Sequence, residues 1–139
     1  MNSQELVHAM KKYAVGVASA LVPARERDLA IRDAATRITG VGQAQYGADD
    51  GSQRFEMLPL PELLEYAREE ALDLINYGTM LAIRLTAEAP DFEGQHHIAM
   101  HITQTGVGLS AEIDRVASAL ATTGLGAVAR RQRENEGQA

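Results

Sequence analysis

Residues 61–85 read PELLEYAREEALDLINYGTMLAIRL, and this stretch decides the fold class. Apolar residues recur in it at steps of three and four, which is the period of an α-helix. No proline interrupts the run after Pro61, and its one glycine is Gly78. The stretch therefore predicts one long helix at the centre of the fold.

Upstream of this helix, the sequence predicts two shorter helices and a long loop. Periodic apolar residues indicate a first helix over about residues 4–21, with Ser3 as its N-cap. Pro23 suits the first turn of a second helix, which reaches about residue 38 and is followed by glycines. Residues 40–59 carry four glycines and two adjacent aspartates. We expect a long loop there.

Downstream of the central helix, the pattern is less decisive. Residues 96–105 fit either a strand or a helix, and we favour a helix because the rest of the chain offers no strand partner. Gly106 and Gly108 are expected to interrupt it, and Ser110 is expected to cap a last helix that reaches about residue 121. The charged residues 124–139 are expected to form a flexible tail.

The composition limits the classes of protein that this chain can belong to. It has 139 residues, no cysteine and a formal charge of −6, and its length predicts a single domain over residues 1–139. The lack of cysteine excludes disulfides and thiolate zinc sites, and the acidic balance argues against general nucleic-acid binding. We expect a cytoplasmic protein that does not bind membranes, because no apolar run could span a bilayer and no leader pattern is present. Alanine and leucine dominate the apolar residues, which favours a compact all-α bundle of four or five helices.

Acidic residues line one side of the predicted 61–85 helix, opposite its apolar side. Charged runs of this kind usually form a solvated face. Here the acids lack basic partners, since Arg68 is the only base between Arg54 and Arg84, and a bound divalent cation would offset their mutual repulsion. Carboxylates at these spacings suit Mg²⁺ or Mn²⁺. The acidic side comprises Glu62, Glu65, Glu69, Asp73 and Asn76, with Glu70 beside it.

The same helix becomes apolar on all sides in its second half. Met80 and Ile83 return to the side that carries the acids. A helix that is apolar all round is normally buried. We therefore expect this half to be covered on both sides, with the acids at the mouth of a buried face.

The segment EEALDLINY at residues 69–77, followed by apolar helix to Leu85, resembles the Glu-Glu-x-x-Asp helix of the MazG-like all-α nucleoside triphosphate pyrophosphatases. The match covers the family's second metal motif, Glu-x-x-Asp, at Glu70 and Asp73. The resemblance implies a homo-oligomer that uses Mg²⁺ to hydrolyse a nucleoside triphosphate to the monophosphate and pyrophosphate. It implies Glu70 and Asp73 as metal ligands and Glu69 as a ligand or catalytic base. The family's other acidic motif lies on a preceding helix, and this sequence lacks it. The alternative sources of these carboxylates are Glu26 or Asp33 of the predicted second helix and a subunit interface.

Further residues are secondary candidates for substrate binding. Arg32 belongs to a segment of interspersed charges, which is typical of an exposed helix face, and its alternative role is to grip a triphosphate. His97 and His101 have the spacing of a helical ligand pair, but no cysteine accompanies them, so exposed or hydrogen-bonded histidines are the favoured interpretation. The candidates are Glu62, Glu65, Asn76, Arg32 and His97.

A second hypothesis is a non-enzymatic helical binding or regulatory protein, of the kind that phages encode, which sequesters a nucleotide signal or binds a host protein. Under this interpretation the acids are a solvated face, and arginines or histidines contact the ligand. Metal linkage separates the two hypotheses, because a ligand that binds only the folded site stabilises the protein by mass action.

Overall fold

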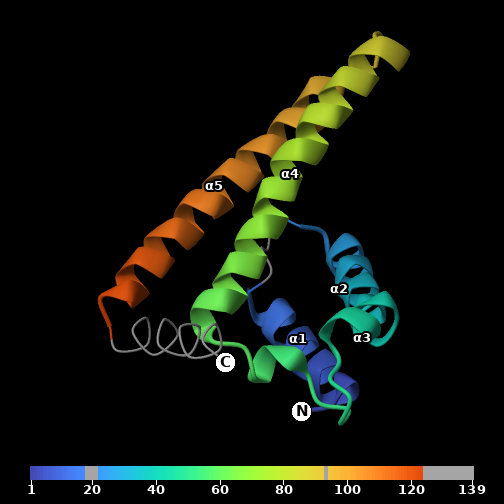
Figure 1. Ribbon diagram of the computed structural model, residues 1–139. Helices are drawn as coiled ribbons and strands as arrows, with labels where there is room; N and C mark the ends of the chain where they lie inside the picture. The colour runs from blue at the N-terminus through green and yellow to red at the C-terminus, as the bar shows by residue number, and fades with distance from the viewer. Residues whose placement is uncertain (18–21, 93, 124–139) are drawn as a thin grey trace. The chain divides into compact units, whose positions relative to one another are not determined.

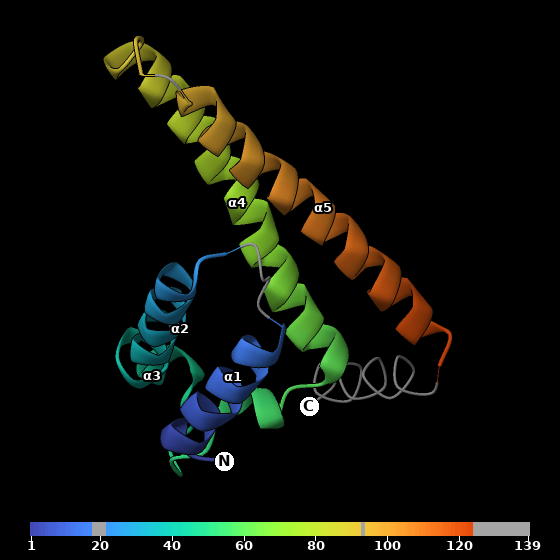
Figure 2. The same cartoon turned by 180° about the vertical axis from the view of Figure 1, so that it is seen from behind.

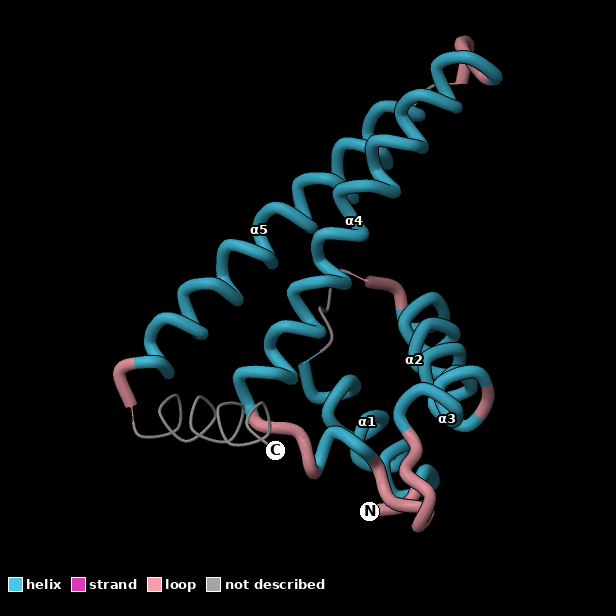
Figure 3. The backbone as a smooth tube through the Cα atoms, viewed as in Figure 1, coloured by secondary structure: helices cyan, strands magenta, loops and turns pink. Residues whose placement is uncertain are grey.

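The computed structural model describes residues 1–17, 22–92 and 94–123, and the regular elements of these residues are helical (Figures 1 and 3). This confirms the all-α prediction with a long helix that packs against another. Residues 18–21 and the tail predicted at 124–139 lie outside the described residues. In chain order the elements are α1 (Ser3–Val17), α2 (Ala24–Thr39), α3 (Val41–Tyr46), a 3-10 turn (Arg54–Glu56), α4 (Leu60–Glu88) and α5 (Gln95–Ala121).

The chain divides into two compact units, where the sequence predicted one domain. The first is Met1–Leu58 and the second begins at Pro59. In the first unit α2 packs against both α1 and α3, and the second unit contains α4 and α5. No helix of the described residues is long and apolar enough to cross a membrane.

Helix α1 begins with a reciprocal cap that Asn2 provides in place of the predicted Ser3. Asn2 Oδ1 accepts a hydrogen bond from the Glu5 backbone N–H at 3.0 Å, and the Asn2 N–H donates to Glu5 Oε2 at 2.7 Å. This capping box satisfies two backbone donors at the helix end. Ser3 is the first residue of the helix, and its hydroxyl donates to Gln43 instead.

Residues 40–59 are more ordered than the predicted loop, and that prediction is wrong for α3 and the 3-10 turn. Gly40 ends α2, and its N–H donates to the Thr36 carbonyl at 2.9 Å. The backbone then reverses through Gly51, which adopts a left-handed φ of 82°. Gln53, only 1% exposed, donates from Nε2 to Ser3 Oγ at 3.0 Å. Side-chain hydrogen bonds, which composition does not reveal, therefore hold this segment against α1.

Helices α4 and α5 are continuous over their whole lengths. The predicted 61–85 helix is confirmed, and the structure extends it to Leu60–Glu88. The helical interpretation of residues 96–105 is also confirmed. The predicted breaks at Gly106 and Gly108 are wrong, because both glycines lie inside α5. Ser110 is not a cap either, since its Oγ donates to the Val107 carbonyl within the helix at 3.0 Å.

A seam of small residues joins α4 and α5 into an antiparallel hairpin (Figures 1 and 2). A methyl group added at Gly78 would lie 2.8 Å from the Ala99 carbonyl oxygen, and one at Gly106 would lie 2.6 Å from that of Ala71. These distances are too short for a real side chain, so the two backbones touch at the glycines. Because the backbones approach so closely, glycine is the residue that fits at these two positions inside the helices.

Candidate functional site

The acidic residues predicted as a site lie on the first half of α4, and they face solvent. Glu62 is half-buried, whereas Glu65, Glu69, Glu70, Asp73 and Asn76 are exposed. Pro61 and Glu62 occupy the first turn of α4. Proline suits this turn because it has no backbone N–H that would lack a partner, and the negative charge of Glu62 suits the electropositive end of the helix. The acids that follow them project into water from successive turns.

Arg68 is the one basic residue among these acids, and a residue of α5 engages it. Its Nε donates to Asp114 Oδ1 at 2.7 Å, and its Nη1 lies 4.0 Å from Glu65. The hydrogen bond that Arg68 donates to Asp114, together with the negative charge of Asp114, raises the pKa of Arg68. In the described residues, therefore, Glu69, Glu70 and Asp73 have no basic partner, as the sequence predicted.

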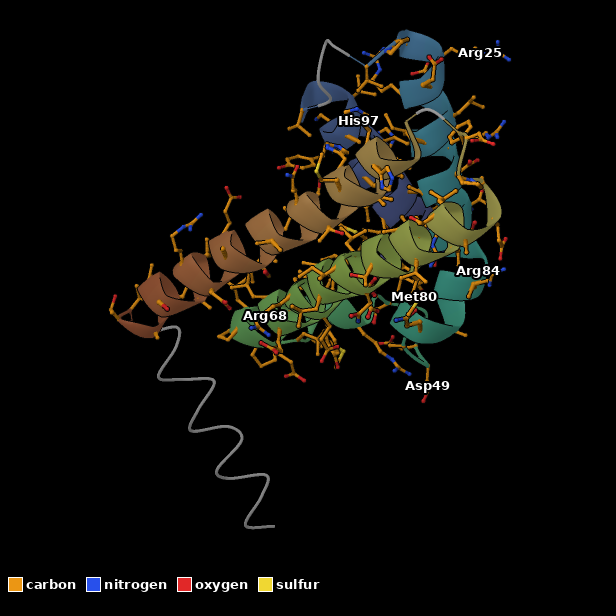
Figure 4. The ribbon with its side chains drawn as sticks, turned by 90° about the horizontal axis from the view of Figure 1, so that it is seen from above. Arg25, Asp49, Arg68, Met80, Arg84 and His97 are labelled. Carbon is orange, nitrogen blue, oxygen red and sulfur yellow. The ribbon has the colours of Figure 1, made fainter. Side chains whose placement is uncertain are left out.

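The structure does not gather the predicted site residues around one point. In the described part of the chain, no three Asp, Glu or His side chains lie close enough to hold a metal ion. Arg32 belongs to the unit of residues 1–58, and its guanidinium is paired with Asp33 at 3.0 Å. His97 is exposed near the tip of the hairpin, on the side of α5 away from α4 (Figure 4). The acids of α4 thus form a one-helix array.

The second half of α4 was predicted to be covered on both sides, and the described residues of the hairpin cover only one of them. Met80 is 57% exposed, and Ile83 is 64% exposed. Met80 projects from the side of α4 away from α5 (Figure 4). These side chains are exposed because α5, a single neighbouring helix, covers only one side of α4.

Sequence reasoning missed a long apolar flank that α4 and α5 share. The Arg68–Asp114 ion pair joins one flank of α4 to the same flank of α5, and so shows which flanks match across the antiparallel pair. At about 100° per residue, a set of large apolar residues lies on the opposite flank of each helix, along most of the hairpin. We call this set the hairpin face: Leu63, Leu74, Tyr77 and Leu81 of α4, with Ile98, Leu109 and Val116 of α5.

Six of the seven hairpin-face residues count as exposed, and Leu74 is half-buried. The exposed fraction is 60% for Tyr77 and 47% for Ile98. In a typical monomeric domain, leucine, isoleucine and valine are the side chains most often fully buried. Here the buried apolar residues of the described chain are three alanines, Ala35, Ala71 and Ala99. Within the described residues of the hairpin, α4 and α5 therefore leave an apolar surface that they do not cover themselves.

The chain matches no protein-family model, no curated protein and no solved structure.

Proposed function

We propose that this chain is a helical binding protein that docks a protein partner on the hairpin face. The observation that carries the proposal is the burial pattern. The hairpin buries alanines and glycines along its seam and leaves six of the seven hairpin-face residues exposed. Contiguous exposed apolar surface of this kind is typical of interaction sites.

The energetics support docking. Covering one exposed leucine, isoleucine or valine gains at most about 2 kcal/mol, and the hairpin face offers seven large apolar residues. Tyr77 adds an aromatic anchor, the residue type that most often dominates binding energy when a partner covers it. Since the seam already fixes the two helices against each other, the face is presented without further ordering of the backbone, which lowers the entropic cost of binding.

Paired substitutions test this function. We expect Tyr77→Ser and Leu109→Gln to abolish binding of an amphipathic helical peptide whose polar side is uncharged, measured by fluorescence anisotropy. Met80→Gln serves as the matched control, because it removes an equally exposed apolar side chain from a different side of α4. Far-UV circular dichroism checks that each variant is folded. Equal peptide binding by all variants would contradict the proposed function.

A second candidate function is the metal-dependent hydrolysis of a nucleoside triphosphate to the monophosphate and pyrophosphate. The observation that favours it is the exposed group Glu69, Glu70 and Asp73, which has no basic partner in the described residues. Glu70 and Asp73 would hold Mg²⁺ or Mn²⁺, and Glu69 would orient water. The metal would neutralise phosphate oxygens. A second copy of the chain would supply the remaining carboxylates, so this function requires a homo-oligomer.

Pyrophosphate release separates this candidate from the first. A panel of nucleoside triphosphates is incubated with the protein and Mg²⁺ or Mn²⁺. If the chain is a hydrolase, Asp73→Asn should abolish release, and Glu112→Gln should retain it because Glu112 lies on α5 beside Arg115, outside the candidate site. No release from any substrate by the folded protein would reject hydrolysis and leave the binding function.

A further inference from the structure

We infer that the partner of the hairpin face is a cationic amphipathic helix, an inference that rests on the proposed binding function. Three features of the hairpin lead to it: its length, its charge and the position of its unpaired acids.

The length of the hairpin face suits a helix. It runs from Leu63 to Leu81 on α4, which at 1.5 Å per residue is about 27 Å. On α5 it runs over the same number of residues, from Ile98 to Val116. Two adjacent helices with apolar residues along one flank form the surface on which a third amphipathic helix packs.

The charge of the hairpin selects a basic partner. Residues 59–123 contain ten acidic and three basic side chains, a formal charge of −7, whereas residues 1–58 contain seven of each. A second copy of the hairpin would bring another seven negative charges to the same surface. A cationic helix would bring charges of the opposite sign, and complementary potentials favour its encounter and its orientation.

The three bases of the hairpin are already engaged with its own acids. Arg68 pairs with Asp114, Arg84 with Glu88, and Arg115 lies 3.8 Å from Glu112. The acids left without a basic partner in the described residues are therefore concentrated on α4. Glu62, Glu69, Glu70 and Asp73 lie on α4, and Asp91 lies in the connection between the helices.

Two of these acids border the hairpin face. On the α-helical period, Glu70 falls in line with Leu63 and Tyr77, and Asp73 lies beside it, one step farther from α5. A helix docked on the apolar residues would thus place one of its polar edges against Glu70 and Asp73. Lysine or arginine along that edge would satisfy both carboxylates.

Three synthetic helices test the inference. They are about 18 residues long, to match the hairpin face. All carry the same leucine stripe, and their polar sides carry lysine and arginine, glutamine, or glutamate. Anisotropy measures their binding at ~0.05 M and ~0.3 M NaCl, where screening differs strongly. We expect the basic helix to bind about tenfold more tightly than the neutral helix at low salt. This difference in affinity should disappear at high salt. We expect the acidic helix not to bind.

Variants locate the charge effect. Glu70→Gln with Asp73→Asn should weaken the basic helix about fivefold and leave the neutral helix unchanged. The matched control, Glu65→Gln, alters an acid that lies beside Arg68 on the opposite flank and should change neither. Tyr77→Ser should abolish binding of both helices, and Leu109→Gln provides a second variant should Tyr77→Ser fail to fold.

The possible failures are distinguishable. Equal affinity for the basic and neutral helices would overturn the cationic partner and leave the docking function intact. A dimer in analytical ultracentrifugation that Tyr77→Ser dissociates would show that a second copy occupies the face, which also overturns the inference. A monomer that binds none of the three helices would overturn the docking function itself.

Discussion

The unit of residues 1–58 is held by side-chain hydrogen bonds between short elements, whereas the α4–α5 hairpin is held by backbone contact between two long ones. In the first unit, the largest fully buried side chain is polar, Gln53, which reaches Ser3 of α1. In the hairpin, Gly78 and Gly106 bring the helices together, and the buried apolar side chains of its described residues are Ala71 and Ala99. The hairpin therefore stays regular although its two helices do not cover their own flanks.

The largest expected effect comes from the seam. Gly106→Ala should destabilise the hairpin by about 2 kcal/mol, because the new methyl group meets backbone atoms that cannot move aside. Gly108→Ala is the matched change two residues away, where nothing lies within 4 Å. It should stabilise α5 by up to about 1 kcal/mol through helix propensity. Urea unfolding followed by far-UV circular dichroism measures both, and equal effects would contradict backbone contact at Gly106.

A smaller effect is expected from the polar contact in the other unit. Gln53→Ala should cost about 1–2 kcal/mol, since it removes a buried hydrogen bond and leaves a cavity. Gln45→Ala changes an exposed glutamine of α3 and should be close to neutral. Hydrogen exchange of the amides in residues 1–58 reports the loss. If Gln45→Ala loosened these amides as much as Gln53→Ala, the buried contact would not be what orders them.

The smallest effect is a pH dependence at the turn before Gln53. Hydrogen bonds from the side chain and backbone of Ser52 hold the pKa of Asp50 below its ordinary value. A carboxylate with a depressed folded-state pKa adds stability that is present above the unfolded-state pKa and is lost as the pH falls through the folded-state pKa. An NMR titration of the Asp50 carboxyl should therefore show a midpoint below that of an unstructured aspartate. Ser52→Ala should raise this midpoint, and an unchanged midpoint would contradict the assigned cause.

The long helix was predictable because its pattern is local. The apolar period of residues 61–85 and the position of Pro61 are enough to locate α4. The glycines of α5 were misread for the opposite reason. Gly106 looks like a break in a single sequence, and only the opposing backbone of α4 explains why it lies inside a helix.

For the candidate site, too, the sequence did not reveal contacts between residues that are far apart in the chain. Spacing alone predicted that acids gather along α4 and expected them at the mouth of a buried face, whereas Glu69, Glu70 and Asp73 are exposed in the structure. It did not reveal that Arg68 reaches across to Asp114, a contact between residues 46 positions apart. It also assigned Tyr77 and Leu81 to one continuous helix without showing which of their sides α5 would cover. Exposure of an apolar flank depends on the neighbours that the fold provides, and periodicity carries no information about them.

Because of the spacing of the small residues, the length of the connection between α4 and α5 helps to select the register in which the two helices pack. Ala71 meets Gly106 and Gly78 meets Ala99, so the small residues repeat every seven positions on both helices. A slide of α5 by seven residues would bring Ala99 beside Ala71, which again places two small residues together. Gly106 would then lose its small partner on α4. Six residues join the helices and end in Gly94, which has a left-handed φ of 89°. The slide would lengthen the span between the helix ends by about 10 Å, so the short connection favours the observed alignment. A longer connection would turn one fixed hairpin into two competing alignments.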